Sequence, residues 1–186
     1  VQILNTYFEL MVEVLLKYNG TINEIIGDAL LVIFGAPQKM PDRAERAIAC
    51  AIEMQNAMVQ VNKENRLQGL PEIEMGIGLN EDEVIVGNIG SSKRSKYGVV
   101  GSGVNMTSRI ESYSVGGQIL ISDSVLKLAG KILRIDGQRE VIPKGADAPV
   151  KIYEVGGIGA PYNFALEKKD PPLVALGKRV PLLYTA

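Results

Sequence analysis

Segments in which apolar residues recur at helical spacing alternate along this chain with paired segments that have the pattern of β-hairpins. The first residues belong to an amphipathic helix over residues 4–18, which Asn19-Gly20 ends. Residues 21–25 and 29–34 then have the pattern of two short strands joined at Gly27-Asp28, a dipeptide typical of a tight turn. This alternation predicts an α/β fold, namely an α+β sandwich in which helices pack on a mostly antiparallel sheet.

The alternation continues to about residue 155. Asp42, followed three residues later by Glu45, forms the pattern of a capping box and predicts the start of a long second helix. Beyond it we expect residues 72–79 and 83–89 to form two strands paired around the acidic turn 80–82, followed by a basic loop at residues 91–96. A short strand at residues 97–100 then leads into a helix, and a strand at residues 118–121 precedes a short helix that Ser122 caps. We expect residues 132–142 and 150–155 to form a closing hairpin. Glycine and proline interrupt the pattern from residue 156. Residues 1–155 are therefore predicted to form one domain, and residues 156–186 a tail or a linker toward a further domain.

Charge and composition exclude several classes of function. With 20 basic and 21 acidic residues, the chain has no electrostatic reason to bind nucleic acid or an anionic membrane. It contains no histidine, which excludes Ser-His and Cys-His catalysis, whereas magnesium or manganese held by carboxylates stays open. Cys50 is the single cysteine, and no apolar run approaches the length of a membrane span. We therefore expect a cytoplasmic chain, or the cytoplasmic part of a larger membrane-attached protein.

Residues 99–111 (VVGSGVNMTSRIE) have the pattern of a strand, a glycine turn and the first turns of a helix. Asn105 and Arg109 are four residues apart, so on a helix they share one face and can reach the same ligand. An amide can position a hydroxyl group, and a guanidinium is a permanent planar cation. The pair suits a ligand that develops negative charge in its transition state.

Together with residues 24–35 (EIIGDALLVIFG), 76–79 (GIGL) and 84–90 (VIVGNIG), this segment closely resembles the class III adenylate and guanylate cyclases, especially the bacterial ones. The motifs stand in the order and with the spacing of that family, from the opening helix to about residue 155. The resemblance implies a ferredoxin-like βαββαβ core, a homodimer with nucleotide bound at its interface, and two divalent cations, Mg²⁺ or Mn²⁺. The implied activity, in intracellular signal transduction, is conversion of a purine nucleoside triphosphate to the 3′,5′-cyclic monophosphate and pyrophosphate.

The resemblance also implies roles for individual residues. Asp28 matches a metal-binding aspartate, and Asn105 matches the residue that orients the ribose. Arg109 matches the arginine that stabilises charge at the α-phosphate during attack by the 3′-hydroxyl group, and Lys144 matches a lysine that contacts the phosphates. Taken singly, each residue has an ordinary structural explanation, such as turn chemistry, helix capping or a solvated charge. Their joint order along the chain favours the functional interpretation.

Two positions that contact the base in this family give conflicting indications. Glu24 stands where adenylate cyclases usually carry Lys and guanylate cyclases carry Glu, which accepts hydrogen bonds from guanine. Gly98 offers no side chain, where adenylate cyclases usually carry Asp or Thr and guanylate cyclases Cys. Because most bacterial relatives form cyclic AMP, we expect ATP as the substrate, with GTP as the alternative. Asp82, where relatives often have glycine, either repels a triphosphate or is a polar turn residue.

The family's other metal-binding aspartate lies on a strand before the opening helix, and the sequence in hand begins inside that helix. The strand is central in the family's sheet, so without it we expect open strand edges. We expect the full-length protein to carry this strand and a regulatory domain. The competing interpretations are a catalytically inactive cyclase-like module for dimerisation or nucleotide sensing and, last, a relative of the diguanylate cyclases, whose Gly-Gly-Asp/Glu-Glu-Phe signature this sequence lacks.

Overall fold

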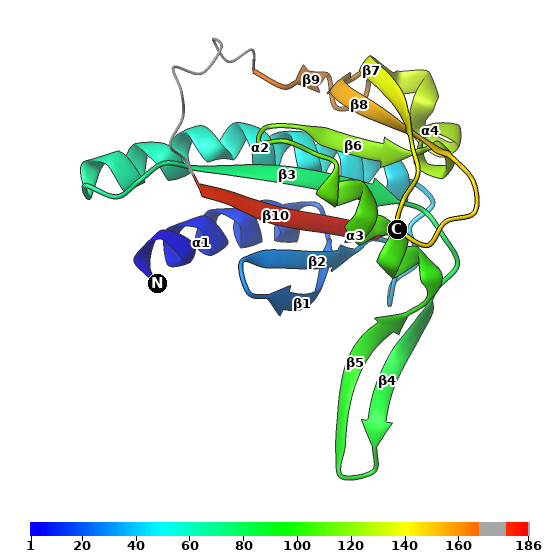
Figure 1. Ribbon diagram of the computed structural model, residues 1–186. Helices are drawn as coiled ribbons and strands as arrows, with labels where there is room; N and C mark the ends of the chain where they lie inside the picture. Colours follow the sequence, from blue (N-terminus) through cyan, green and yellow to red (C-terminus); the bar gives the residue numbers. More distant parts are fainter. Residues whose placement is uncertain (168–177, 186) are drawn as a thin grey trace.

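A mixed β-sheet with helices on both faces forms the centre of the structure (Figure 1). The computed structural model describes residues 1–167 and 178–185. The elements, in chain order, are α1 (Gln2–Lys17), β1 (Thr21–Ile26), β2 (Ala29–Ile33), α2 (Arg43–Leu67), β3 (Ile73–Asn80), β4 (Ile85–Ser91), β5 (Arg94–Val100), α3 (Ser102–Ser112), β6 (Ile119–Ser122), α4 (Asp123–Ala129), the 3-10 turn η1 (Gly130–Ile132), β7 (Leu133–Val141), β8 (Val150–Ile158), β9 (Phe164–Ala165) and β10 (Lys178–Thr185). The predicted α+β class is confirmed.

The main sheet has the strand order β1-β2-β10-β3-β6-β8-β7, and β9 pairs with β8. β1 and β2 form the expected antiparallel hairpin, but β10 is parallel to both β2 and β3, and β3 is parallel to β6. Four of the seven strand pairs in the main sheet are antiparallel, so the prediction of a mostly antiparallel sheet is confirmed. The centre of the sheet is parallel, because segments distant in sequence enter it in the same direction. β10 fills the space between β2 and β3 where we expected open edges, and its sequence contains no acidic residue.

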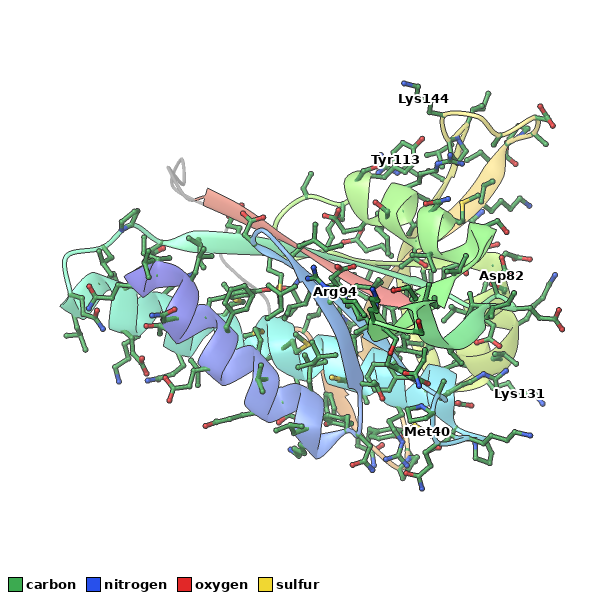
Figure 2. The ribbon with its side chains drawn as sticks, turned by 90° about the horizontal axis from the view of Figure 1, so that it is seen from below. Met40, Asp82, Arg94, Tyr113, Lys131 and Lys144 are labelled. Atoms are coloured by element: carbon green, nitrogen blue, oxygen red, sulfur yellow. The ribbon has the colours of Figure 1, made fainter. Side chains whose placement is uncertain are left out.

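Helices α1, α2 and α4 cover one face of the sheet and α3 covers the other (Figures 1 and 2). Side chains alternate along β3, so Met75, Ile77 and Leu79 enter the core beneath α1 and α2. Gly78 faces α3, where a Cβ atom would lie 2.5 Å from the backbone nitrogen of Glu111. Only glycine permits this close approach, which seats α3 directly on the sheet.

Strands β4 and β5 form a separate two-stranded hairpin that projects from the body of the molecule (Figure 1). The expected pairing of residues 72–79 with 83–89 is therefore wrong. β3 already has β10 on one edge and β6 on the other, so β4 has no free edge there to join. Residues 91–96, which we expected to form a basic loop, instead form the end of β4, the tip of the hairpin and the start of β5.

The remaining elements agree closely with the expected ones, with two exceptions. Ser122 caps α4 as predicted, because its hydroxyl oxygen accepts a hydrogen bond from Val125 N. Asp42 precedes α2 but does not cap it, since its carboxylate pairs with Arg46 instead, at 2.9 Å.

β8 continues through Gly156 and Gly157, where the sequence predicted a tail. A Cβ atom at Gly156 would collide with the side chains of Asp136 and Arg134, so this glycine allows cross-strand contact and does not end the strand.

Candidate active site

Asp28 lies in the tight turn between β1 and β2, as the sequence predicted. Gly27 has φ +63°, a left-handed conformation that favours glycine and closes this turn. The Asp28 side chain is half-buried at the edge of the sheet beside α1. Burial raises the pKa of the Tyr7 hydroxyl on α1, and the negative charge of Asp28 raises it further. The turn therefore holds a carboxylate close to the interior yet reachable from outside.

Glu24 and Gly98 are brought to one place by an ion pair between β1 and β5. Glu24 Oε1 lies 2.7 Å from Lys96 Nζ, and both side chains are partly exposed. Lys96 and Gly98 are two residues apart on β5, so they face the same side of that strand. Lys96 therefore links Glu24 to the strand and the side of that strand on which Gly98 lies.

Sequence reasoning missed Lys96. We expected β5 to start at residue 97 and assigned residues 91–96 to a basic loop, whereas β5 starts at Arg94. The signal that could have found it is the period of two, because Lys96 precedes Gly98 by one side-chain repeat of a strand. A strand drawn three residues longer, from Arg94, would have placed a cation on the same side of the strand as Gly98.

Asn105, Arg109 and Lys144 lie in one region on the α3 face of the sheet. Asn105 and Arg109 occupy the outer surface of α3, with Asn105 exposed. Gly145, next to Lys144 on the β7–β8 loop, lies so close to Arg109 that its missing Cβ would be 3.6 Å from Arg109 Nη2. Figure 2 labels Lys144 on this exposed loop, near the C-terminal end of α3. Within the part of the chain that the structure describes, neither cation has a carboxylate partner.

Asp82 lies against the first turn of α3 (Figure 2). A Cβ atom at Gly103 would lie 2.5 Å from Asp82 Cβ, and Asp82 Oδ1 accepts a hydrogen bond from Glu83 N at 2.8 Å. A carboxylate at the N-terminus of a helix is stabilised by the exposed N–H groups there. This geometry favours the second of the two explanations for Asp82, a polar turn residue that stabilises α3.

A complete two-metal site is not formed by the residues that the structure describes. They include no group of three or more Asp, Glu, Cys or His residues able to hold a metal ion. The Asp28 carboxylate fits a single divalent cation that shares its other ligands with substrate phosphates and water, which is how proteins commonly hold Mg²⁺. Among the described residues, no helix is both long and apolar enough to cross a membrane.

Comparison with known proteins agrees with this geometry. Residues 1–158 match the model of the family described as the adenylate and guanylate cyclase catalytic domain. Adenylate cyclase 1 of Rhizobium meliloti is 30% identical over 165 residues, covering 88% of this chain and 25% of that protein. The adenylate cyclase of Anabaena cylindrica is 34% identical over 163 residues, covering 82% of this chain and 31% of that protein. The chain thus spans a quarter to a third of the length of these relatives.

Two solved structures extend the comparison to the fold. The guanylyl cyclase Cya2 is 53% identical and superposes with a TM-score of 0.87, over 90% of this chain and 85% of that one. The adenylyl cyclase CyaB of P. aeruginosa is 30% identical, with a TM-score of 0.74 over 92% of this chain and 84% of that one.

Proposed function

This chain belongs to the adenylate and guanylate cyclase catalytic domain family, and from that premise we propose that it converts GTP to 3′,5′-cyclic GMP and pyrophosphate. The observation that carries the proposal is the approach of the loop that carries Lys144 to Arg109, on the helix that also carries Asn105. Among the described residues neither cation has a carboxylate partner. A half-buried and an exposed cation of this kind, near an amide on the same helix, suit a polyphosphate attached to a sugar.

The reaction joins the ribose 3′-oxygen to the α-phosphorus and breaks the bond from that phosphorus to the oxygen bridging it to the β-phosphate. The 3′-hydroxyl proton passes to solvent water, and pyrophosphate departs with the bridging oxygen. Asn105 orients the ribose so that the 3′-oxygen faces the α-phosphorus, which gives proximity without covalent catalysis. The Arg109 guanidinium donates hydrogen bonds to the α-phosphate oxygens as negative charge grows on them. Lys144 pairs with the remaining phosphates and holds the leaving group.

Asp28, together with the substrate phosphates, would hold a divalent cation, Mg²⁺ or Mn²⁺, and that cation would supply acidification of the 3′-hydroxyl group and offset phosphate charge. The contribution of this chain is the Asp28 carboxylate, which a tight turn leaves accessible to a ligand. The family's second metal-binding aspartate is not among the residues of this sequence, so we assign no residue to a second cation.

GTP is preferred to ATP in this proposal because of Glu24. Guanine presents a ring N–H and an amino group on one edge, and a carboxylate accepts a hydrogen bond from each. Lys96 Nζ lies 2.7 Å from Glu24 Oε1, which fixes the orientation of the carboxylate. The guanylyl cyclase Cya2, at 53% identity, supports the same substrate. The curated relatives at 30% and 34% identity are adenylate cyclases, so ATP, our expectation from the sequence, is the alternative.

We further propose that two copies of the chain share each site. Large apolar side chains that are about half exposed or more lie on β1, β4 and β5, namely Ile25, Ile26, Ile85, Ile89 and Val100. A projecting hairpin with such side chains buries them best against a partner, and a second copy of this chain is the partner that also brings a second set of site residues. In a two-fold dimer, Asp28 and Glu24 serve different sites.

Turnover of the full-length protein with GTP and with ATP, each with Mg²⁺ and with Mn²⁺, tests the proposed function. We expect cyclic GMP to form with a kcat/KM for GTP at least about tenfold above that for ATP, the factor that one charge-assisted hydrogen bond supplies. A preference for ATP would establish an adenylate cyclase. Absence of product with both nucleotides, in a sample that still binds them, would establish the inactive nucleotide-sensing module.

A further inference from the structure

Tyr113 connects the helix that carries Arg109 to the loop that carries Lys144. It is the residue at which α3 ends, and its hydroxyl group donates a hydrogen bond to the carbonyl oxygen of Ile142 at 3.2 Å. Ile142 immediately precedes Pro143-Lys144 at the start of the β7–β8 loop. Figure 2 shows Tyr113 and Lys144 on the same side of the molecule. The Tyr113 hydroxyl group therefore connects α3, which carries Arg109, to the loop that carries Lys144.

The ring of Tyr113 is held independently of that hydroxyl group. The carbonyl oxygen of Tyr113 accepts a hydrogen bond from Arg139 Nη2 at 2.6 Å, and the Arg139 guanidinium lies 5.7 Å from the ring centroid. The ring also packs on a small second core between α3 and the sheet, formed by Ile110, Leu120 and Ile152 with Met106, Val141 and Val150 around them. Removal of the hydroxyl group alone should leave the ring in place.

The Lys144 loop lies beside the Arg109 guanidinium. A Cβ atom at Gly145 would lie 3.6 Å from Arg109 Nη2, and Lys144, one residue earlier, is exposed. An exposed loop opens away from its neighbours easily unless a contact holds it. Pro143 is buried and the Ile142 carbonyl is bonded, so the loop is fixed at its base while Lys144 stays free to meet a ligand.

We propose that Tyr113 is a positioning residue that holds the Lys144 loop against Arg109, so that both cations are already in place for the same triphosphate. The proposal rests on the proposed function for its ligand, but the hydrogen bond itself belongs to the chain alone. Its effect reaches the substrate through Lys144, which pairs with the phosphates before and during the reaction. Loss of the bond should therefore act mainly on KM for the nucleotide and less on kcat.

Tyr113→Phe in the full-length protein tests this, with Tyr162→Phe as the matched control. Tyr162 is also partly buried but lies on the α1 and α2 side, beside Tyr18 and Phe164. We expect Tyr113→Phe to raise KM for GTP about 2- to 10-fold, the range for one hydrogen bond, and Tyr162→Phe to leave it unchanged. In a Lys144→Ala background the Tyr113→Phe effect should vanish, because the loop then has no cation to position.

Two results would overturn the proposal: an equal, additive effect of Tyr113→Phe with and without Lys144, or unchanged amide hydrogen exchange at residues 144–147. The exchange measurement needs no nucleotide, so it separates this proposal from the proposed function. If the protein turns over neither GTP nor ATP, the proposed function fails. Faster exchange of the loop amides in Tyr113→Phe, with an unchanged unfolding midpoint, still supports the positioning role.

Discussion

Arg109→Ala is expected to reduce kcat about 10²- to 10³-fold while changing KM for GTP much less. The guanidinium is fixed on α3 and donates to oxygens whose charge grows only as the transition state forms, so its loss raises the barrier rather than weakening binding. Steady-state kinetics of cyclic GMP formation measure both constants. Nothing in the described structure ties Arg109 to a carboxylate, so the substitution leaves no buried charge behind.

Arg66→Ala is the matched control for this substitution. Arg66 is an exposed arginine in the last turn of α2, paired with Glu72 and remote from α3 in sequence and on the other face of the sheet. An exposed pair of this kind contributes little, so we expect its kcat and unfolding midpoint to stay near those of the unmodified protein. An Arg109→Ala variant that turned over GTP as fast as the Arg66→Ala variant would remove the role assigned to α3.

Glu24→Gln should lower kcat/KM for GTP about 10- to 100-fold and leave the value for ATP almost unchanged. The amide keeps the shape of the side chain but loses its charge, and its NH₂ group faces the donors of guanine, so charge-assisted hydrogen bonds are lost. The quantity to measure is the ratio of the two kcat/KM values. A fall of that ratio identifies a contact to the base, whereas equal losses for both nucleotides would identify a structural effect.

Glu53→Gln provides the comparison, because Glu53 also pairs with a lysine, Lys17, at 2.8 Å. That pair joins α1 to α2 on the face of the sheet opposite α3. We expect it to shift stability slightly and the GTP-to-ATP ratio not at all. If Glu53→Gln changed the ratio as much as Glu24→Gln, the assignment of Glu24 to guanine would be wrong.

Local patterns predicted the elements of this fold well where the signal is contained in a few neighbouring residues. The hairpin closed by Gly27-Asp28 and the Ser122 cap depend on turn and cap chemistry, and both are confirmed. The capping box at Asp42 failed because Arg46, one helical turn later, takes the carboxylate. A competing ion pair of this kind has the same sequence spacing as many exposed pairs that do nothing.

Strand partners could not be predicted in the same way. β4 alternates like a partner of β3, yet it pairs with β5, since β3 is already enclosed by β6 and β10. The two-residue repeat of a strand tells which face of the sheet a side chain lies on, but not which strand lies beside it. The same limit hid the contribution of Lys96, whose proximity to Glu24 is set by how the β4–β5 hairpin meets β1. The site residues themselves came from motif order, and their roles stay predictions.

Mixing two inactive variants tests most directly whether this chain is a cyclase whose sites lie between two copies. Asp28→Ala and Arg109→Ala each remove one half of every site, and a mixed dimer retains one site with both residues intact. With random exchange of subunits, an equal mixture should regain about a quarter of the activity of the unmodified protein, since half the dimers are mixed and each has one of two sites. A mixture as inactive as its separate components, beside an active unmodified protein, would place Asp28 and Arg109 in the same copy and contradict the account.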